Sequence, residues 1–269
     1  MIRNSVVIRF SLRIEAWAKQ AYGEEANRQA WFAYRARIFN EGLLTCLERQ
    51  TEPGAVAYLL MDDSDRSQYE THIRKSGLLR PIFAGTSHPA SGLVAEDILK
   101  SGAQDVAISR IDSDDLVSVF YIEAINRAIR SAIARDQGFD YVIAPHGYRT
   151  DMRRIEDFHH ERSPFLTLFT PVYDGRNVYA LNHWDVLAQP HILCDEARWV
   201  QIIHDSNLAN TFTPTSNARS IAEFWPADIP FPDIAGAVWA NGAALPNPRG
   251  RPPLLRRLAG RLKRAVRGG

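Results

Sequence analysis

Apolar runs and amphipathic stretches alternate along the first half of the chain. We predict strands for the runs rich in β-branched and aromatic residues, at 5–12, 55–63, 79–85 and 106–111. We predict helices where apolar residues recur at helical spacing, at 24–49, 67–77, 92–102 and 116–136. This alternation predicts an α/β fold with a mainly parallel central sheet flanked by helices.

The second half of the chain is less regular. Strands are expected over 139–148 and 177–186, and a helix over 194–207. The polar segment 149–165 between the two strands is expected to be a solvated loop or a lid, and 208–253 an irregular surface segment.

Acidic residues gather where two of the apolar runs end. Asp62 and Asp63 close one run, and Asp112, Asp114 and Asp115 close another. In open α/β sheets, ligands bind beyond the carboxyl ends of the strands, which is where these carboxylates are expected.

Two explanations of Asp112, Asp114 and Asp115 stay open. The three acids would cap a helix that starts at Leu116, since carboxylates satisfy free N–H groups and suit the positive end of the helix dipole. Alternatively, they would hold Mn²⁺ or Mg²⁺ together with a nucleotide diphosphate, because these cations prefer one or two carboxylates plus phosphate oxygens.

Composition and charge narrow the class of protein. The 269 residues are 45% hydrophobic, and they predict one domain over 1–245 and a tail over 246–269. Cys46 and Cys194 are too few for a disulfide framework, and no apolar run is long enough to cross a membrane, so a cytoplasmic protein is expected. Without the eight basic residues of 249–267, 24 basic residues face 31 acidic ones, a net charge of −7 that argues against nucleic-acid binding.

The tail itself is basic. Leu254, Leu258, Leu262 and Val266 recur every four residues among arginines and lysines, which predicts a short amphipathic helix suited to an anionic membrane surface. Such a tail would place the protein peripherally on the inner face of the cytoplasmic membrane. A disordered, solubilising tail is the alternative.

Several segments resemble a known family. "RFSLR", "VAYLLMDD", "ISRIDSDDLVSVFY", "GFDYVIAPHGY", "SPFLTLF", "VYALNHW" and "WVQIIHDSN" occur in an order similar to the rhamnosyltransferase family of bacterial glycosyltransferases, over about 5–207. The resemblance implies a GT-A-like single domain with a Rossmann-like nucleotide-binding half, an acceptor-binding half and a cation held at D-x-D. It also implies a dTDP-, UDP- or GDP-linked sugar donor.

The resemblance assigns roles to individual residues. Asp112 would face the ribose or the sugar, Asp114 and His204 would bind the metal with Asp112, and Asp115 would hold the donor sugar or assist catalysis. Arg9 would approach the diphosphate.

The donor-binding set is completed by Asp62 at the same sheet edge, Arg110 in the motif and Gly147 in "APHGY". A plain turn explains Gly147 equally well.

An inverting transfer needs a base for the acceptor hydroxyl. Asp185 is the expected base, because it would follow a strand that holds it rigidly. His183 and the titratable residues of 151–161 are alternatives. Trp184 and Trp199 are expected to serve either as sugar-stacking platforms or as core residues, and the core is the commoner use.

The sequence therefore predicts a metal-dependent glycosyltransferase that acts on a glycan or lipid-linked acceptor in surface polysaccharide synthesis. Two alternatives are a sugar-nucleotide nucleotidyltransferase, which would need a Gly-rich loop that "SLRIEAW" lacks, and a membrane-associated carbohydrate- or cation-binding module without catalysis.

Overall fold

The computed structural model describes residues 2–13, 27–85, 90–203, 212–232 and 234. Its helices are α2 (Arg28–Glu41), α3 (Leu43–Glu48), α4 (Arg66–His72), α5 (Ala90–Lys100) and α6 (Tyr121–Ala134), with short 3-10 helices η2 (Asp63–Asp65) and η3 (His183–Ala188). Its strands are β1 (Arg3–Arg9), β2 (Val56–Asp62), β3 (Leu79–Ala84), β4 (Val106–Asp112), β5 (Leu116–Val117), β6 (Tyr141–Ile143), β7 (His146–Thr150), β8 (Arg154–His159), β9 (Leu166–Thr170), β10 (His191–Leu193), β11 (Trp199–Ile202) and β12 (Arg219–Ser220).

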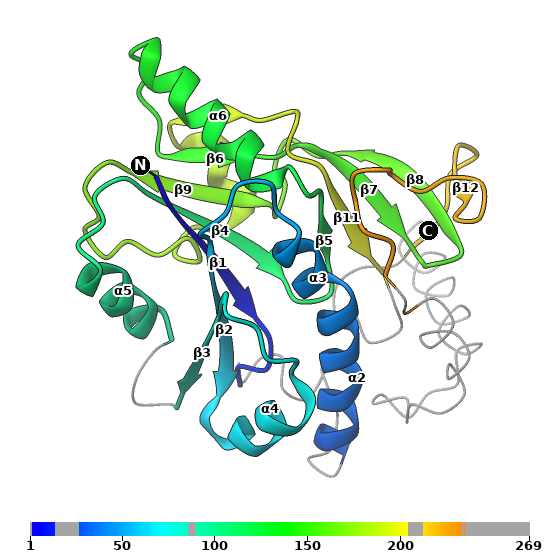
Figure 1. Ribbon diagram of the computed structural model, residues 1–269. Coiled ribbons are helices and arrows are strands. Elements are labelled where there is room, and N and C mark those ends of the chain that lie inside the picture. Colours follow the sequence, from blue (N-terminus) through cyan, green and yellow to red (C-terminus); the bar gives the residue numbers. More distant parts are fainter. Residues whose placement is uncertain (1, 14–26, 86–89, 204–211, 233, 235–269) are drawn as a thin grey trace, which may run out of the picture.

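A seven-stranded sheet forms the centre of the molecule, in the order β10-β6-β9-β4-β1-β2-β3. Every neighbouring pair is parallel except the two pairs that β9 makes with β4 and β6. The predicted α/β fold with a mainly parallel sheet is therefore confirmed. A second sheet, β12-β8-β7-β11-β5, lies to one side of the first (Figure 1) and was not expected from the sequence.

Both faces of the central sheet are covered, which explains why β1, β2 and β4 are rich in apolar residues and buried along most of their length. Helices α2, α3, α4 and α6 pack on the face that carries Ile8, Leu59 and Ala107. Helix α5 and the segment around Val186 of η3 pack on the other face, which carries Val7 and Ile108. Opposite sets of alternating side chains thus meet two separate cores.

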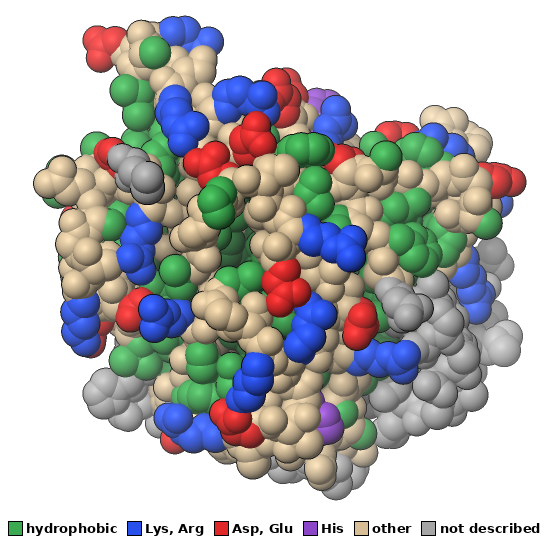
Figure 2. Space-filling model, in the orientation of Figure 1, with side chains coloured by type: hydrophobic (Ala, Val, Ile, Leu, Met, Phe, Trp, Pro, Cys, Tyr) green, Lys and Arg blue, Asp and Glu red, His purple; other side chains and the backbone are tan. Residues whose placement is uncertain are grey.

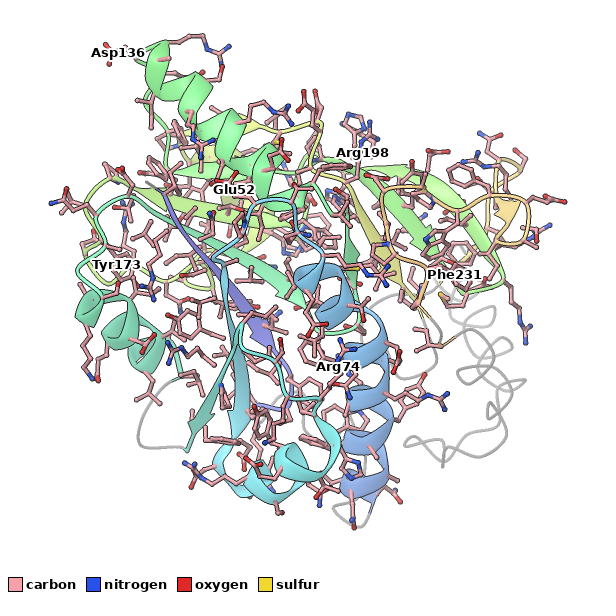
Figure 3. All side chains as sticks on the ribbon, viewed as in Figure 1. Glu52, Arg74, Asp136, Tyr173, Arg198 and Phe231 are labelled. Carbon is pink, nitrogen blue, oxygen red and sulfur yellow. The ribbon has the colours of Figure 1, made fainter. Side chains whose placement is uncertain are left out.

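Ion pairs fasten the helices to their neighbours. Glu52, in the loop after α3 (Figure 3), accepts a hydrogen bond from Arg130 of α6 at 3.0 Å. Basic and acidic side chains are interspersed over the face seen in Figure 2.

The expected helix over 24–49 is wrong as a single element, since α2 and α3 are separate helices that meet at Gly42. A Cβ at Gly42 would stand 2.6 Å from the carbonyl oxygen of Ile38 and 2.8 Å from the side chain of Leu116. Gly42 therefore lets the chain change direction while β5 lies close against it. The predicted helix over 67–77 also ends early, at His72.

Three predictions for the second half of the chain are wrong. Segment 149–165 is not a loop, since β8 lies within it and pairs with β7. No strand covers 177–186, where η3 and irregular backbone are found instead, and 194–203 contains strand β11 in place of a helix. Short apolar runs do not distinguish strand, helix and coil locally. Strands β8 and β11 are fixed by pairing within the second sheet, whereas η3 packs on the central sheet through Val186.

Among the described residues, no helix is both long and apolar enough to cross a bilayer. The predicted tail helix at 246–269 lies outside the described residues, as does His204.

Candidate active site

The ends of β1 and β4 bring two arginines and one carboxylate together. Arg9 and Asp112 are partners in the parallel register, as are Val7 and Arg110. Alternation along the strands then places Arg9, Arg110 and Asp112 on the same face of the sheet, the face that η3 covers. Arg9 Nη2 donates a hydrogen bond to Asp112 Oδ1 at 3.3 Å.

Tyr179 lies beneath both guanidinium groups. The Cζ atoms of Arg9 and Arg110 stand 4.5 Å and 5.4 Å from the centre of its ring. Its hydroxyl donates to the carbonyl oxygen of Val7 at 3.1 Å, and burial together with the nearby Asp112 raises the pKa of Tyr179 to about 12. Tyr179 thus stays protonated and serves as a cation–π surface for the two arginines.

Arg110 also fixes the tautomer of His183. Its Nε donates to the carbonyl oxygen of Pro164 at 3.0 Å, and its Nη2 lies 3.2 Å from His183 Nδ1. A guanidinium can only donate, so Nδ1 is the acceptor and the ring proton is on Nε2. Burial, followed by the charges of Arg110 and His160, lowers the pKa of His183 to about 4, so the imidazole is neutral at pH 7.

Electrostatics favour an anion at this edge of the sheet. Burial lowers the pKa of Arg110, and the charge of the neighbouring Arg9 lowers it further. Asp112 offsets one of the two positive charges, and its side chain is 45% exposed. A bound diphosphate would stabilise the remaining positive charge, and guanidinium groups present donors suited to phosphate oxygens.

Asp114 faces away from this edge, toward α2. Arg35 Nη1 donates to Asp114 Oδ2 at 2.6 Å and Nη2 to Oδ1 at 3.1 Å, while Nη2 also reaches Ser113 Oγ at 2.6 Å. Both carboxylate oxygens are thereby engaged by one buried guanidinium. The pair joins the turn after β4 to α2.

Asp115 is buried between the two sheets. Its Oδ1 accepts a hydrogen bond from the backbone N–H of Ile202, in β11, at 3.3 Å. Burial, together with the charges of Asp114 and Asp112, raises the pKa of Asp115 well above its usual range. The carboxyl group contacts the second sheet and not the open edge.

The helix-cap explanation of these acids is wrong. Helix α6 begins at Tyr121, its N-cap is Phe120, and no side chain caps it. Strand β5 lies between the acids and the helix, and pairs with β11 of the second sheet. The three carboxylates therefore serve other roles: contact with Arg9, the Arg35 ion pair and the bond to Ile202.

Asp62 lies at the end of β2 and takes part in a local network. It accepts hydrogen bonds from the backbone N–H of Ser64 at 3.0 Å and from the Ser64 hydroxyl, as the N-cap of η2. Its carboxylate is also 3.4 Å from Arg13 Nε and 3.7 Å from Arg28 Nη2. A contact of Asp62 with the donor stays a prediction.

Among the described residues, no cluster of three His, Cys, Asp or Glu side chains forms. Asp112 fits a cation shared with a diphosphate, because it offers an exposed hard oxygen at the right edge. In this structure Arg35 engages both oxygens of Asp114, and Asp114 as a metal ligand stays a prediction. His204 lies outside the described residues.

Asp185 lies in the short helix η3, and not after the strand that was predicted to hold it. Its side chain is exposed. Its neighbour Trp184 is 52% exposed and has its backbone N–H capped by Asn182 Oδ1 at 3.2 Å. Asp185 as the base stays a prediction.

Gly147 leaves the space that the ring of Trp199 occupies. A Cβ at Gly147 would stand 2.2 Å from the indole of Trp199, which is buried, stacks on Phe165 at 4.4 Å and donates to the carbonyl oxygen of Ala144 at 2.9 Å. The core role expected for Trp199 is confirmed. Gly147 lies inside β7, not in a turn, and its contact with the donor stays a prediction.

Most of the titratable cluster at 151–161 is structural. Glu156 is buried, where it accepts from Arg149 Nη2 at 2.7 Å and from the backbone N–H of Thr215 at 2.9 Å. His159 packs on His146 with ring centres 4.4 Å apart. His160 of this cluster contacts η3, through the ring of Trp184.

Two residues that the sequence interpretation missed are Tyr179 and Arg35. Tyr179 lies in irregular backbone, and Arg35 was assigned only to the periodicity of a helix. No local signal identifies either one, since each acts on residues about 70 or more positions away in the chain.

A family model described as "Putative rhamnosyl transferase" matches residues 5–216. No curated protein matches the chain.

Several solved structures are distantly similar. TarS residues 1–349 from S. aureus, in complex with UDP, has 10% identity and a TM-score of 0.39 over 76% of this chain and 62% of its own. A "putative nucleotide-diphospho-sugar transferase" from Desulfovibrio desulfuricans has 13% identity and a TM-score of 0.35, over 72% and 80%. A 4-diphosphocytidyl-2C-methyl-D-erythritol synthase has 13% and 0.35, over 78% and 94%. The chain spans 22% of a longer TarS structure.

Proposed function

Because the chain belongs to the family described as "Putative rhamnosyl transferase", we propose that it transfers a sugar from a nucleoside diphosphate donor to a glycan or lipid-linked acceptor. Family membership supports a glycosyltransferase. The finer proposal is an inverting, GT-A-type enzyme of surface polysaccharide synthesis with a dTDP-, UDP- or GDP-linked donor. The observation that carries it is the joint placement of Arg9, Arg110 and Asp112 at the carboxyl edge of β1 and β4.

The arginines suit the departing group. When the bond between the sugar and the diphosphate breaks, negative charge develops on the diphosphate, and fixed donors aimed at that charge lower the barrier. Tyr179 holds both guanidinium groups in place before the substrate arrives. His183 adds a neutral Nε2–H donor next to Arg110.

Asp112 has two compatible roles. It would contact a ribose or sugar hydroxyl, and it is the described residue that would hold Mn²⁺ or Mg²⁺ against the diphosphate. A bound cation supplies Lewis-acid stabilisation of the leaving group. Asp185, exposed on η3 beside His183, is proposed as the base that accepts the acceptor hydroxyl's proton.

Calorimetric titration with UDP, dTDP and GDP, each with and without Mn²⁺, tests the proposal. Wild type should bind one of the nucleotides, and Arg9→Gln should weaken that binding by about 10- to 100-fold, as expected for a lost hydrogen bond to a charged group. Arg74→Gln is the matched control, because Arg74 (Figure 3) also pairs with one carboxylate, Glu48. It packs with residues of α2 and α3, the helices on the other face of the sheet.

No binding of any nucleotide to the folded wild-type protein would overturn the proposal. Equal losses in Arg9→Gln and Arg74→Gln would also count against it, because the effect would then be one of overall charge.

A further inference from the structure

An exposed tryptophan lies near Arg9 and Arg110, at the carboxyl ends of β1 and β4. Trp184 is 52% exposed, although the next apolar residue of η3, Val186, is buried in the core and anchors the segment. The ring of His183 is 5.0 Å from the indole and the ring of His160 is 5.4 Å from it. The indole thus contacts two imidazoles that come from separate segments of the chain.

The two imidazoles present the same kind of group. His183 Nδ1 accepts from Arg110 Nη2 at 3.2 Å, and His160 Nδ1 accepts from the backbone N–H of Arg162 at 3.0 Å. Both donors lack an acceptor function, so each ring carries its proton on Nε2. Two neutral imidazoles, each with an N–H donor, therefore contact the indole.

His160 is held firmly in this arrangement. Its backbone N–H donates to the carbonyl oxygen of Pro145 at 2.9 Å, directly after β8 ends. Its ring also lies 5.9 Å from that of Phe158. The subsite is thus built on one side by the second sheet and on the other by η3.

We propose that Trp184, His160 and His183 form a subsite for a sugar ring. The apolar C–H face of a pyranose would pack on the indole, and its hydroxyl oxygens would accept hydrogen bonds from the two Nε2–H groups. Arg110 links this subsite to the proposed diphosphate site, since its guanidinium contacts both His183 and Tyr179. The inference rests on the proposed function, and the ring belongs either to the donor sugar or to the acceptor.

Binding measurements on the full chain separate these sources. The probes are free UDP, dTDP and GDP, then UDP-glucose, dTDP-rhamnose and GDP-mannose, then the methyl glycosides of glucose, rhamnose and mannose. The variants are Trp184→Ala, Trp184→Phe and, as a control, Phe120→Ala, an exposed aromatic residue at the start of α6. Light scattering on each variant reports the oligomeric state.

Trp184→Ala should leave the affinity for the free nucleotide within about twofold and weaken binding of the sugar-bearing probe by about tenfold. Trp184→Phe should recover part of that loss, and Phe120→Ala should resemble wild type. A loss confined to the nucleotide sugar assigns the subsite to the donor, and a loss confined to the methyl glycoside assigns it to the acceptor.

A second pair of variants tests the donors on the imidazoles. His160→Gln keeps an N–H donor and should retain more sugar affinity than His160→Leu, whereas a purely structural role would not favour an amide.

The subsite is overturned if wild type binds a nucleotide but Trp184→Ala binds every sugar-bearing probe as wild type does. It is also overturned if wild type binds no nucleotide sugar better than the free nucleotide and binds no methyl glycoside, or if Trp184→Ala only changes the oligomeric state. If glycoside binding depends on Trp184 while no nucleotide binds, the proposed function fails and the subsite stands.

Discussion

Arg35 of α2 binds both carboxylate oxygens of Asp114, at 2.6 Å and 3.1 Å. The acids of the motif D-S-D-D, residues 112–115, therefore have different roles. Asp112 is left exposed at the strand edge beside Arg9, while Asp114 and Asp115 are buried. One acidic motif therefore contributes a carboxylate to the candidate site and two carboxylates to the interior. The stability and the binding of the protein should respond to different members of it.

Removing one partner of the buried pair should destabilise the fold. Asp114→Asn is expected to lower the free energy of unfolding by about 3–5 kcal/mol, because the largely buried Arg35 guanidinium would lose the carboxylate charge that it contacts most closely. Urea denaturation followed by circular dichroism measures the change.

The exposed pair of Arg66 and Asp63 offers a control of the same residue types, at 2.7 Å. Asp63→Asn should cost no more than about 1 kcal/mol, because solvent screens an exposed ion pair. A similar cost at both positions would contradict the structural role of Asp114.

Metal dependence should follow Asp112. If Mn²⁺ strengthens nucleotide binding to the wild type, Asp112→Asn should abolish that gain, because Asp112 offers the exposed oxygen. Asp114→Asn should keep the gain at a temperature where it is folded. Calorimetric titration of both variants with and without Mn²⁺ tests this. A gain that is kept in Asp112→Asn and lost in folded Asp114→Asn would identify Asp114 as the ligand.

Asp115 should make stability depend on pH. Its pKa in the folded state is raised, mainly by burial, so the folded protein keeps a proton that the unfolded chain releases above a pH of about 4. The contribution of Asp115 is fully present below that pH and is lost as the pH rises through the folded-state pKa, by up to about 1.4 kcal/mol per pH unit.

Asp115→Asn imitates the protonated side chain and still offers an oxygen to the Ile202 N–H. Relative to wild type, this variant should gain stability steadily as the pH rises from 4. Parallel urea denaturation curves at pH 4, 6 and 8 test this, and a constant difference between the two proteins would refute it.

Gly147 should tolerate no side chain. Gly147→Ala forces a Cβ to within 2.2 Å of the Trp199 ring in a packed core, which should cost about 1–3 kcal/mol. Gly138→Ala has open space around the new Cβ and should be within about 0.5 kcal/mol of wild type. Thermal unfolding of the two variants compares them, and equal melting temperatures would show that Trp199 moves freely.

The sequence by itself determined the central sheet and the position of its ligand edge. The runs of β1, β2 and β4 are rich in apolar residues because both faces of the sheet are covered, and parallel strands need crossover connections, which here contain helices. Arg9, Asp62 and Asp112 were predicted at that edge because the chain order of strands and helices alone puts their carboxyl ends on one side.

Only the tertiary structure decided which acid faces which partner. At the end of β4, Asp112 contacts Arg9, and in the turn that follows Asp114 contacts Arg35. The sequence does not show that these two acids, two positions apart, have different partners. Tyr179 reaches the site from irregular backbone, and Trp184 from the short helix η3, whose Val186 packs against the sheet. Contacts of this kind depend on the complementarity of distant surfaces, for which a short stretch of sequence carries no signature.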